Sequence, residues 1–278
     1  MNIKFKEIVL FIFSIIALAG CDKNEIKPIQ ETVKSVARIT VINAVPGSPG
    51  LNTFYGDLKL NGTAINALTR FPNAEYSILP PASYTIKTVV NTPPPVVPAP
   101  IIPPLPPTIA FGATVSTITT TLEVDKYYSL YIVGPPVVAN ISSFLIEDKI
   151  PVPMSEKAHV RFINAMPDGN NMDLLSGIIP AGSVNPITST AIFSNVVKNT
   201  ARDFIAIDAL NVGTPYQFQL KDNITGALIG APINLTVVTG RVYTFFSRNF
   251  NTNYTVPGFT NPTRIVLGGG GIALMVNK

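Results

Sequence analysis

The chain has 278 residues, of which 46% are hydrophobic and only 13% are charged, and its formal net charge is +4. No dense cluster of lysine and arginine occurs, so the sequence offers little support for a nucleic-acid partner. One cysteine excludes an intrachain disulfide, and one histidine leaves too few ligands for a typical zinc site. We therefore expect no cofactor.

The first twenty residues predict an export signal. Two lysines precede an apolar run at residues 8–19, which is too short for a typical membrane-spanning helix. The run leads into Leu-Ala-Gly-Cys at residues 18–21, which resembles the lipobox of bacterial lipoproteins. The resemblance implies that residues 1–20 are removed as a signal peptide and that Cys21 is acylated. An ordinary signal peptide with an incidental cysteine is the alternative.

Residues 21–35 are then expected to be a linker between the lipid and the folded part. Acyl chains on Cys21 would make the membrane a partner, because each buried CH₂ group contributes about 0.8 kcal/mol. The acidic residues Asp22 and Glu25 resemble the surface-export signals of Bacteroidetes lipoproteins. They favour an outer-membrane location, on either the periplasmic or the surface face.

Two matching segments indicate an internal repeat. Residues 37–46 read Ala-Arg-Ile-Thr-Val-Ile-Asn-Ala-Val-Pro, and residues 158–167 read Ala-His-Val-Arg-Phe-Ile-Asn-Ala-Met-Pro, 121 positions later. In both, the first, third and fifth residues are apolar, which predicts a strand with one buried face that ends at the Asn-Ala-x-Pro turn. Short β-branched runs between turn residues follow each segment, so we predict an all-β fold of two tandem β-sandwiches at residues 36–149 and 158–250.

Two copies of this strand and turn behind a lipobox resemble the bacterial lipoproteins with tandem domains of unknown function 4397, which are often from Bacteroidetes. The resemblance covers most of residues 36–250. It implies immunoglobulin- or transthyretin-like sandwiches in a cell-envelope protein, and it implies neither a known activity nor catalytic residues. The sequence departs from the family's usual compactness through an insertion in the first copy.

The insertion spans residues 93–107 and contains nine prolines, which favours stiff polyproline II structure. We interpret it as a surface loop between two strands. The alternative is an apolar patch for a partner or lipid, formed by Val96, Val97, Ile101, Ile102 and Leu105. Residues 150–157 are the expected linker between the sandwiches. Residues 251–278 are expected to be a C-terminal extension that ends in a strand-like segment.

Few residues could carry chemistry. Strand alternation places His159 on the polar face beside Arg161, which predicts a histidine exposed to solvent. Asp168, Asn170 and Asp173 bring oxygen ligands that calcium prefers into one turn. Aspartate and asparagine are also ordinary turn formers, so this turn is only a weak calcium candidate.

Acidic residues at positions 147, 148, 203 and 208 could act on a glycosidic bond only if the fold brought two of them together. We therefore expect no enzyme. The leading hypothesis is a non-enzymatic binding, adhesion or structural module of the cell envelope, with an envelope protein or a glycan as its partner. A glycan-binding accessory lipoprotein of a polysaccharide-uptake system is the second hypothesis, and a carboxylate-dependent hydrolase is the third.

Overall fold

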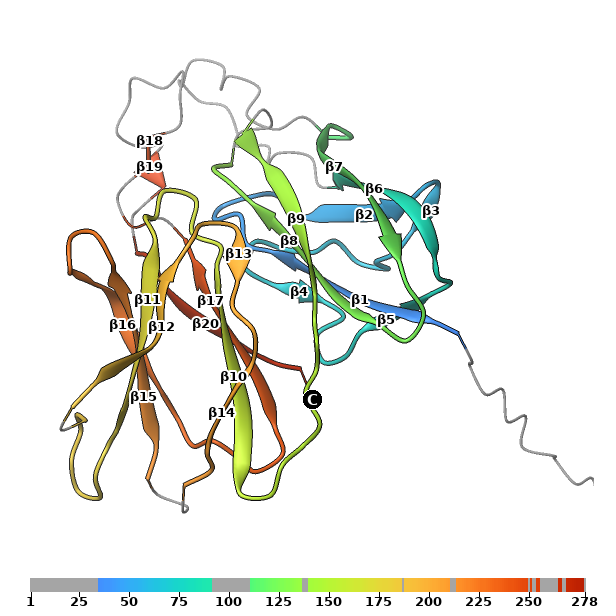
Figure 1. Cartoon of the computed structure of the whole chain (residues 1–278). Coiled ribbons are helices and arrows are strands. Elements are labelled where there is room, and N and C mark those ends of the chain that lie inside the picture. The colour runs from blue at the N-terminus through green and yellow to red at the C-terminus, as the bar shows by residue number, and fades with distance from the viewer. Residues whose placement is uncertain are drawn as a thin grey trace, which may run out of the picture. The chain divides into compact units, whose positions relative to one another are not determined.

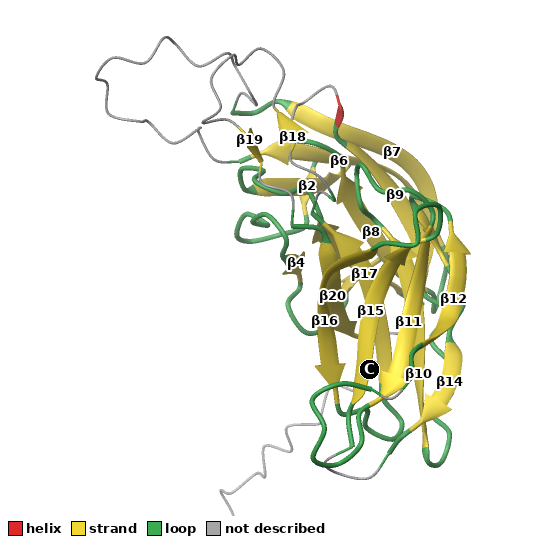
Figure 2. Cartoon of the chain, turned by 90° about the vertical axis from the view of Figure 1, so that its left-hand side faces the viewer, coloured by secondary structure: helices red, strands yellow, loops and turns green. Residues whose placement is uncertain are grey.

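A computed structural model describes residues 35–91, 111–136, 140–186, 188–210, 214–249, 251, 254–255, 265–266 and 269–277. The predicted signal peptide, Cys21 and the proline-rich insertion lie outside these residues. The described residues form 20 strands joined by loops (Figures 1 and 2). No helix in this part of the chain is long and apolar enough to cross a membrane.

The first sandwich consists of two sheets. One has the strand order β4-β1-β8-β9, with β5 also paired to β1, and the other has the order β3-β2-β6-β7. The strands are β1 (Ala37–Asn43), β2 (Leu51–Tyr55), β3 (Leu58–Lys59), β4 (Arg70–Phe71), β5 (Ser77–Leu79), β6 (Ala82–Val90), β7 (Thr114–Leu122), β8 (Tyr127–Val133) and β9 (Ser142–Glu147). Ile39, Val41 and Leu130 from the first sheet pack with Leu51 and Ile86 from the second in one core.

The second sandwich repeats this plan. Its sheets have the orders β13-β10-β17-β20, with β14 also paired to β10, and β12-β11-β15-β16. The strands are β10 (Lys157–Asn164), β11 (Met172–Ile178), β12 (Thr190–Val196), β13 (Thr200–Ala201), β14 (Ile205–Asp208), β15 (Tyr216–Asp222), β16 (Leu228–Leu235), β17 (Val242–Arg248) and β20 (Gly271–Val276); β18 (Tyr254–Thr255) and β19 (Ile265–Val266) pair separately. Val160, Phe162, Phe218 and Phe245 are central to the second core.

The register of the strands follows the sequence repeat. β1 is parallel to β8 with Ile39 opposite Tyr128, and β10 is parallel to β17 with Val160 opposite Tyr243. Ile39 and Val160 occupy the same position in the two matching segments, so Tyr128 and Tyr243 are equivalent. Both tyrosine hydroxyls accept a backbone N–H five residues upstream, at 3.0 and 3.2 Å. The predicted fold class, two consecutive β-sandwiches, is confirmed.

The asparagine of the repeated Asn-Ala-x-Pro motif closes the turn that follows each strand. Asn43 donates through Nδ2 to the Ile65 carbonyl at 3.0 Å, and its Oδ1 accepts the Val45 N–H at 3.2 Å. Asn164 donates to the Asn170 and Val196 carbonyls at 2.9 and 3.0 Å. Both asparagines are fully buried, so the motif satisfies backbone groups inside the fold.

We expect Asn164→Ala to lower the free energy of unfolding by about 3 kcal/mol, because it leaves two carbonyls and the Ser247 hydroxyl without their buried partner. Urea denaturation of wild type and variant measures this loss. Asn234→Ala is the matched control, since Asn234 is exposed and should cost less than about 0.5 kcal/mol. Equal effects of the two substitutions would contradict the assigned role.

The outer face of β10 is buried at His159 and Arg161, which corrects one expectation. The sequence predicts His159 on a solvent-exposed face beside Arg161, yet their exposed fractions are only 6% and 2%. Burial also lowers the pKa of His159 below its usual value. Strand alternation assigns the two faces correctly, but it cannot show that another sheet covers the second face.

The limit predicted for the second sandwich also needs correction. The sequence predicts an end at residue 250, with residues 251–278 as an extension. Instead, β20 pairs antiparallel with β17 from Tyr243↔Val276 to Arg248↔Gly271. Ile272 and Met275 of β20 are buried. The strand-like segment is therefore part of the sheet.

Candidate functional site

The two sandwiches meet through the outer faces of the sheets that contain β1 and β10. An apolar cluster joins them, with buried members from both: Ile42, Ala44, Tyr131, Val133, Ile163, Ala165, Phe246 and Met275. Tyr131 stacks on Phe144 at a centroid distance of 5.3 Å and meets the edge of Phe246 at 5.7 Å. The contact is therefore a hydrophobic core of its own, and Ser35–Lys278 forms one compact unit.

A closed ring of polar side chains lies beside this apolar cluster. We call it the polar ring; its members are Tyr76, Ser129 and Asp148 from the first sandwich and Arg161, Thr244 and Asn277 from the second. Arg161 forms an ion pair with Asp148 through Nη2 and donates through Nε to Thr244 Oγ1 at 2.9 Å. The Thr244 hydroxyl donates to Asn277 Oδ1 at 2.6 Å.

The ring closes through Tyr76. Asn277 Nδ2 donates to the Tyr76 hydroxyl at 2.8 Å, and that hydroxyl donates to Asp148 Oδ2 at 2.7 Å. Ser129 donates to the same carboxylate oxygen at 2.6 Å. Each polar member thus has a partner, and the contacts of Arg161 with Asp148 and of Asn277 with Tyr76 cross between the sandwiches.

The electrostatics of the polar ring favour a permanently ionised Arg161. Burial disfavours the charged guanidinium, but Asp148 outweighs it and raises the Arg161 pKa above its usual value. Burial and Asp148 also raise the pKa of Tyr76, so its hydroxyl stays protonated and can donate. The guanidinium further stacks over the Phe204 ring, with its Cζ 4.6 Å from the ring centroid.

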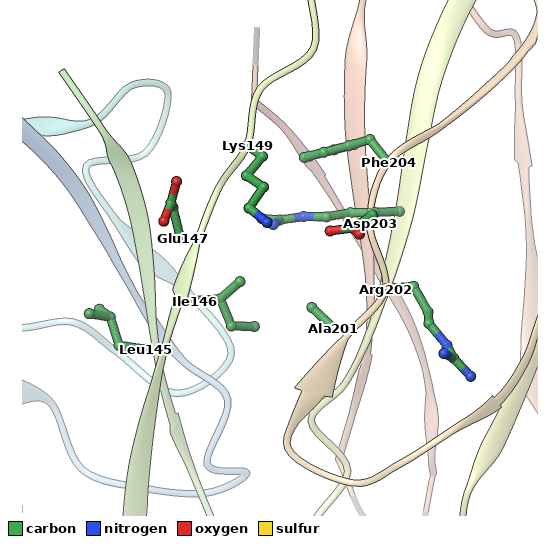
Figure 3. Close-up of a pocket in the computed structure, with 9 residues that line it drawn as sticks. Leu145, Ile146, Glu147, Lys149, Ala201, Arg202, Asp203 and Phe204 are labelled. Atoms are coloured by element: carbon green, nitrogen blue, oxygen red, sulfur yellow. The ribbon is translucent and has the colours of Figure 1, made fainter.

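A pocket of about 340 Å³ opens next to Arg161 (Figure 3). One side is formed by β9 and the residues after it, and the other by the segment between β13 and β14. Its lining residues are Leu145, Ile146, Glu147, Lys149, Arg161, Ala201, Arg202, Asp203 and Phe204. Figure 3 shows the Arg202 side chain directed away from the pocket, where it donates to the Ser194 carbonyl at 2.8 Å.

The hydrolase hypothesis requires two of four acidic residues to lie close together, and two of them line this pocket. Glu147 and Asp203 both line it, and Glu147 already accepts a hydrogen bond from Lys126 at 3.2 Å. Asp148 is held in the polar ring, and Asp208 binds Lys157 at the surface. Basic and acidic side chains therefore both line this pocket, and its charges favour neither an anionic nor a cationic ligand.

The residues of the weak calcium candidate have other partners. Asp173 accepts the Asn195 N–H and the Asn223 amide, both at 2.8 Å, and pairs with Lys221 at 3.3 Å. Burial disfavours the charged carboxylate, but these donors outweigh it and lower the Asp173 pKa. Asp168 Oδ1 accepts the Asn251 N–H, and Asn170 donates to Asp222. Among the described residues, no group of three or more His, Cys, Asp or Glu could hold a metal ion.

Sequence reasoning missed the polar ring, although one signal for it was present. Arg161 occupies the position that Thr40 holds in the first matching segment, facing away from the core. An arginine in place of a threonine in an otherwise similar strand marks a change of surroundings. The predicted patch residues Val96 to Leu105 and the lipidation site Cys21 lie outside the described residues.

Comparisons with known proteins identify the family. The sequence profile described as "Domain of unknown function (DUF4397)" matches residues 37–175, half of the chain. No curated protein matches the sequence. Among solved structures, the fimbrial anchor protein Mfa2 from Porphyromonas gingivalis is similar over 87% of this chain and 95% of that chain, at 13% identity. Its TM-score of 0.24 is too low to carry an argument. The profile match is sufficient by itself, and the chain belongs to the DUF4397 family.

Proposed function

We propose that the chain is a lipid-anchored protein of the cell envelope whose paired sandwiches form one rigid, non-enzymatic binding or structural module. The anchor is supported by the apolar run and the lipobox-like residues 18–21. The outer membrane is the favoured location, because Asp22 and Glu25 follow the cysteine and resemble the surface-export signals of Bacteroidetes lipoproteins.

The contact between the two sandwiches is the observation that carries the structural part of this proposal. Tandem domains joined only by a linker swing relative to each other, whereas a large apolar interface fixes them. Here an aromatic cluster and a buried ion pair join the two sheets. Such a body can hold its loops at fixed positions relative to one another, and loops on a rigid scaffold are the usual contact surfaces. The implied partner is an envelope protein or a glycan.

The anchor is tested with Cys21→Ala. We expect the variant to lose incorporation of a labelled fatty acid completely and to leave the membrane fraction, because no acyl acceptor remains. Asp22→Ala is the matched control, since it keeps the cysteine and should still be labelled. Labelling of the Cys21→Ala protein, or its continued membrane binding, would refute the tether.

A further inference from the structure

The polar ring is built on equivalent positions of the two sandwiches. Thr40 and Arg161 are equivalent through the matching segments, and Ser129 and Thr244 lie opposite them on β8 and β17. Asp148 and Asn277 each follow an edge strand and donate their N–H to the first residue of the neighbouring strand, at 2.7 and 2.8 Å. The two sandwiches differ at these equivalent positions in their side chains: the first has Thr40 and Asp148, whereas the second has Arg161 and Asn277.

The contacts also obey an approximate twofold relation. The pocket beside Arg161 lies between Ile146 of β9 and Ala201 of β13. A second pocket of about 320 Å³ includes Met275 of β20 and Arg70 of β4, which are the equivalent positions. Arg70 also reaches the Val276 carbonyl at 3.4 Å. Each sandwich thus offers the same face to the other, as the subunits of a symmetric dimer do.

We propose that the Arg161–Asp148 pair makes this self-complementary face selective for an unlike partner. A face of the first type carries Asp148 and Thr40, so two such faces would bury two Asp148 carboxylates without the Arg161 guanidinium that pairs with Asp148 in the native contact. Two faces of the second type would bury two Arg161 guanidinium groups without the Asp148 carboxylate, because Asn277 occupies the equivalent position. Only the unlike combination places one arginine against one aspartate.

The selectivity follows from the cost of burying a charge. A like pairing buries each ion without its partner, so its desolvation is not compensated, and the two like charges repel as well. The apolar cluster cannot discriminate in this way, because both faces contribute aromatic and aliphatic side chains to it. The charged pair therefore acts against like pairing, while the apolar cluster supplies general affinity.

The first test relocates the pair to its mirror position. The half-relocated chain carries Thr40→Arg and Arg161→Thr, so the introduced guanidinium faces Asn277 while Asp148 loses its cation. The fully relocated chain adds Asp148→Asn and Asn277→Asp. We expect the half-relocated chain to melt about 10 °C below wild type and the full set to recover most of this shift. Equal melting temperatures of the two variants would overturn the proposal.

A second test does not depend on those variants folding. The exposed linker, where Val152 is 82% exposed, receives a protease site, and the folded chain is cut there. Cut wild-type protein is mixed with isotope-labelled cut protein, and native mass spectrometry reads the pairs that form on exchange. We expect unlike pairs alone from wild type, and additional like pairs from Arg161→Met with Asp148→Leu, which removes both charges. Like pairs from wild type, or none from the neutral variant, would overturn the proposal.

Discussion

Arg161→Met is expected to lower the free energy of unfolding by about 3–5 kcal/mol, because it leaves the Asp148 carboxylate buried without a cation. Methionine retains much of the apolar stem, so the loss reports mainly the missing charge. Thr244 also loses the guanidinium donor at 2.9 Å. Urea denaturation followed by circular dichroism measures the effect.

Two variants separate the charge from the packing in this experiment. Arg202→Met removes an exposed arginine whose side chain points away from the pocket beside Arg161, and it should change the free energy of unfolding by less than about 0.5 kcal/mol. Arg161→Met combined with Asp148→Leu should recover most of the stability, because replacing a whole buried ion pair with apolar groups is often neutral. If the double variant were as unstable as the single one, the unpaired carboxylate would not be the cause.

The apolar faces of the strands could be predicted from the sequence. Alternation assigns Ile39 and Val41 to one core and Val160 and Phe162 to the other, and the structure places them there. This success has a local cause, since a two-residue period is set by the strand itself. The internal repeat predicts the second sandwich, because two segments with the same pattern of apolar residues are expected to form strands with the same pairing.

The full membership of the polar ring could not be predicted, because its members are brought together only by the contact between the sandwiches; the arginine at position 161 was the one signal in the sequence. Tyr76 and Asn277 are 201 positions apart, and no local pattern links them. His159 and Arg161 look like solvent-facing polar residues in an alternating strand. Whether another sheet covers the outer face depends on the tertiary structure, and the alternation of apolar and polar residues along one strand contains no information about it.

The C-terminal strand shows how a wrong boundary changes an experiment. Were residues 251–278 an extension, removing residues 271–278 would leave stability nearly unchanged. The structure predicts the opposite, because this deletion removes the ladder with β17 and the buried Ile272 and Met275. Each of these two side chains contributes about 2–3 kcal/mol by burial alone. Against a typical domain stability of about 5–15 kcal/mol, we expect no cooperatively folded protein.

Thermal denaturation of the truncated chain decides between the two expectations. Asn277→Ala is the control: it keeps β20 but removes two hydrogen bonds of the polar ring, so it should lose only about 1–3 kcal/mol and still melt cooperatively. A truncated chain that melted near the wild-type temperature would show that β20 contributes little to the stability of the second sandwich. We expect a small loss of stability for Asn277→Ala and a complete loss of cooperative unfolding for the deletion. That result would show that β20 stabilises the second sandwich as an edge strand, and that the residues at its C-terminal end also stabilise the contact with the first sandwich.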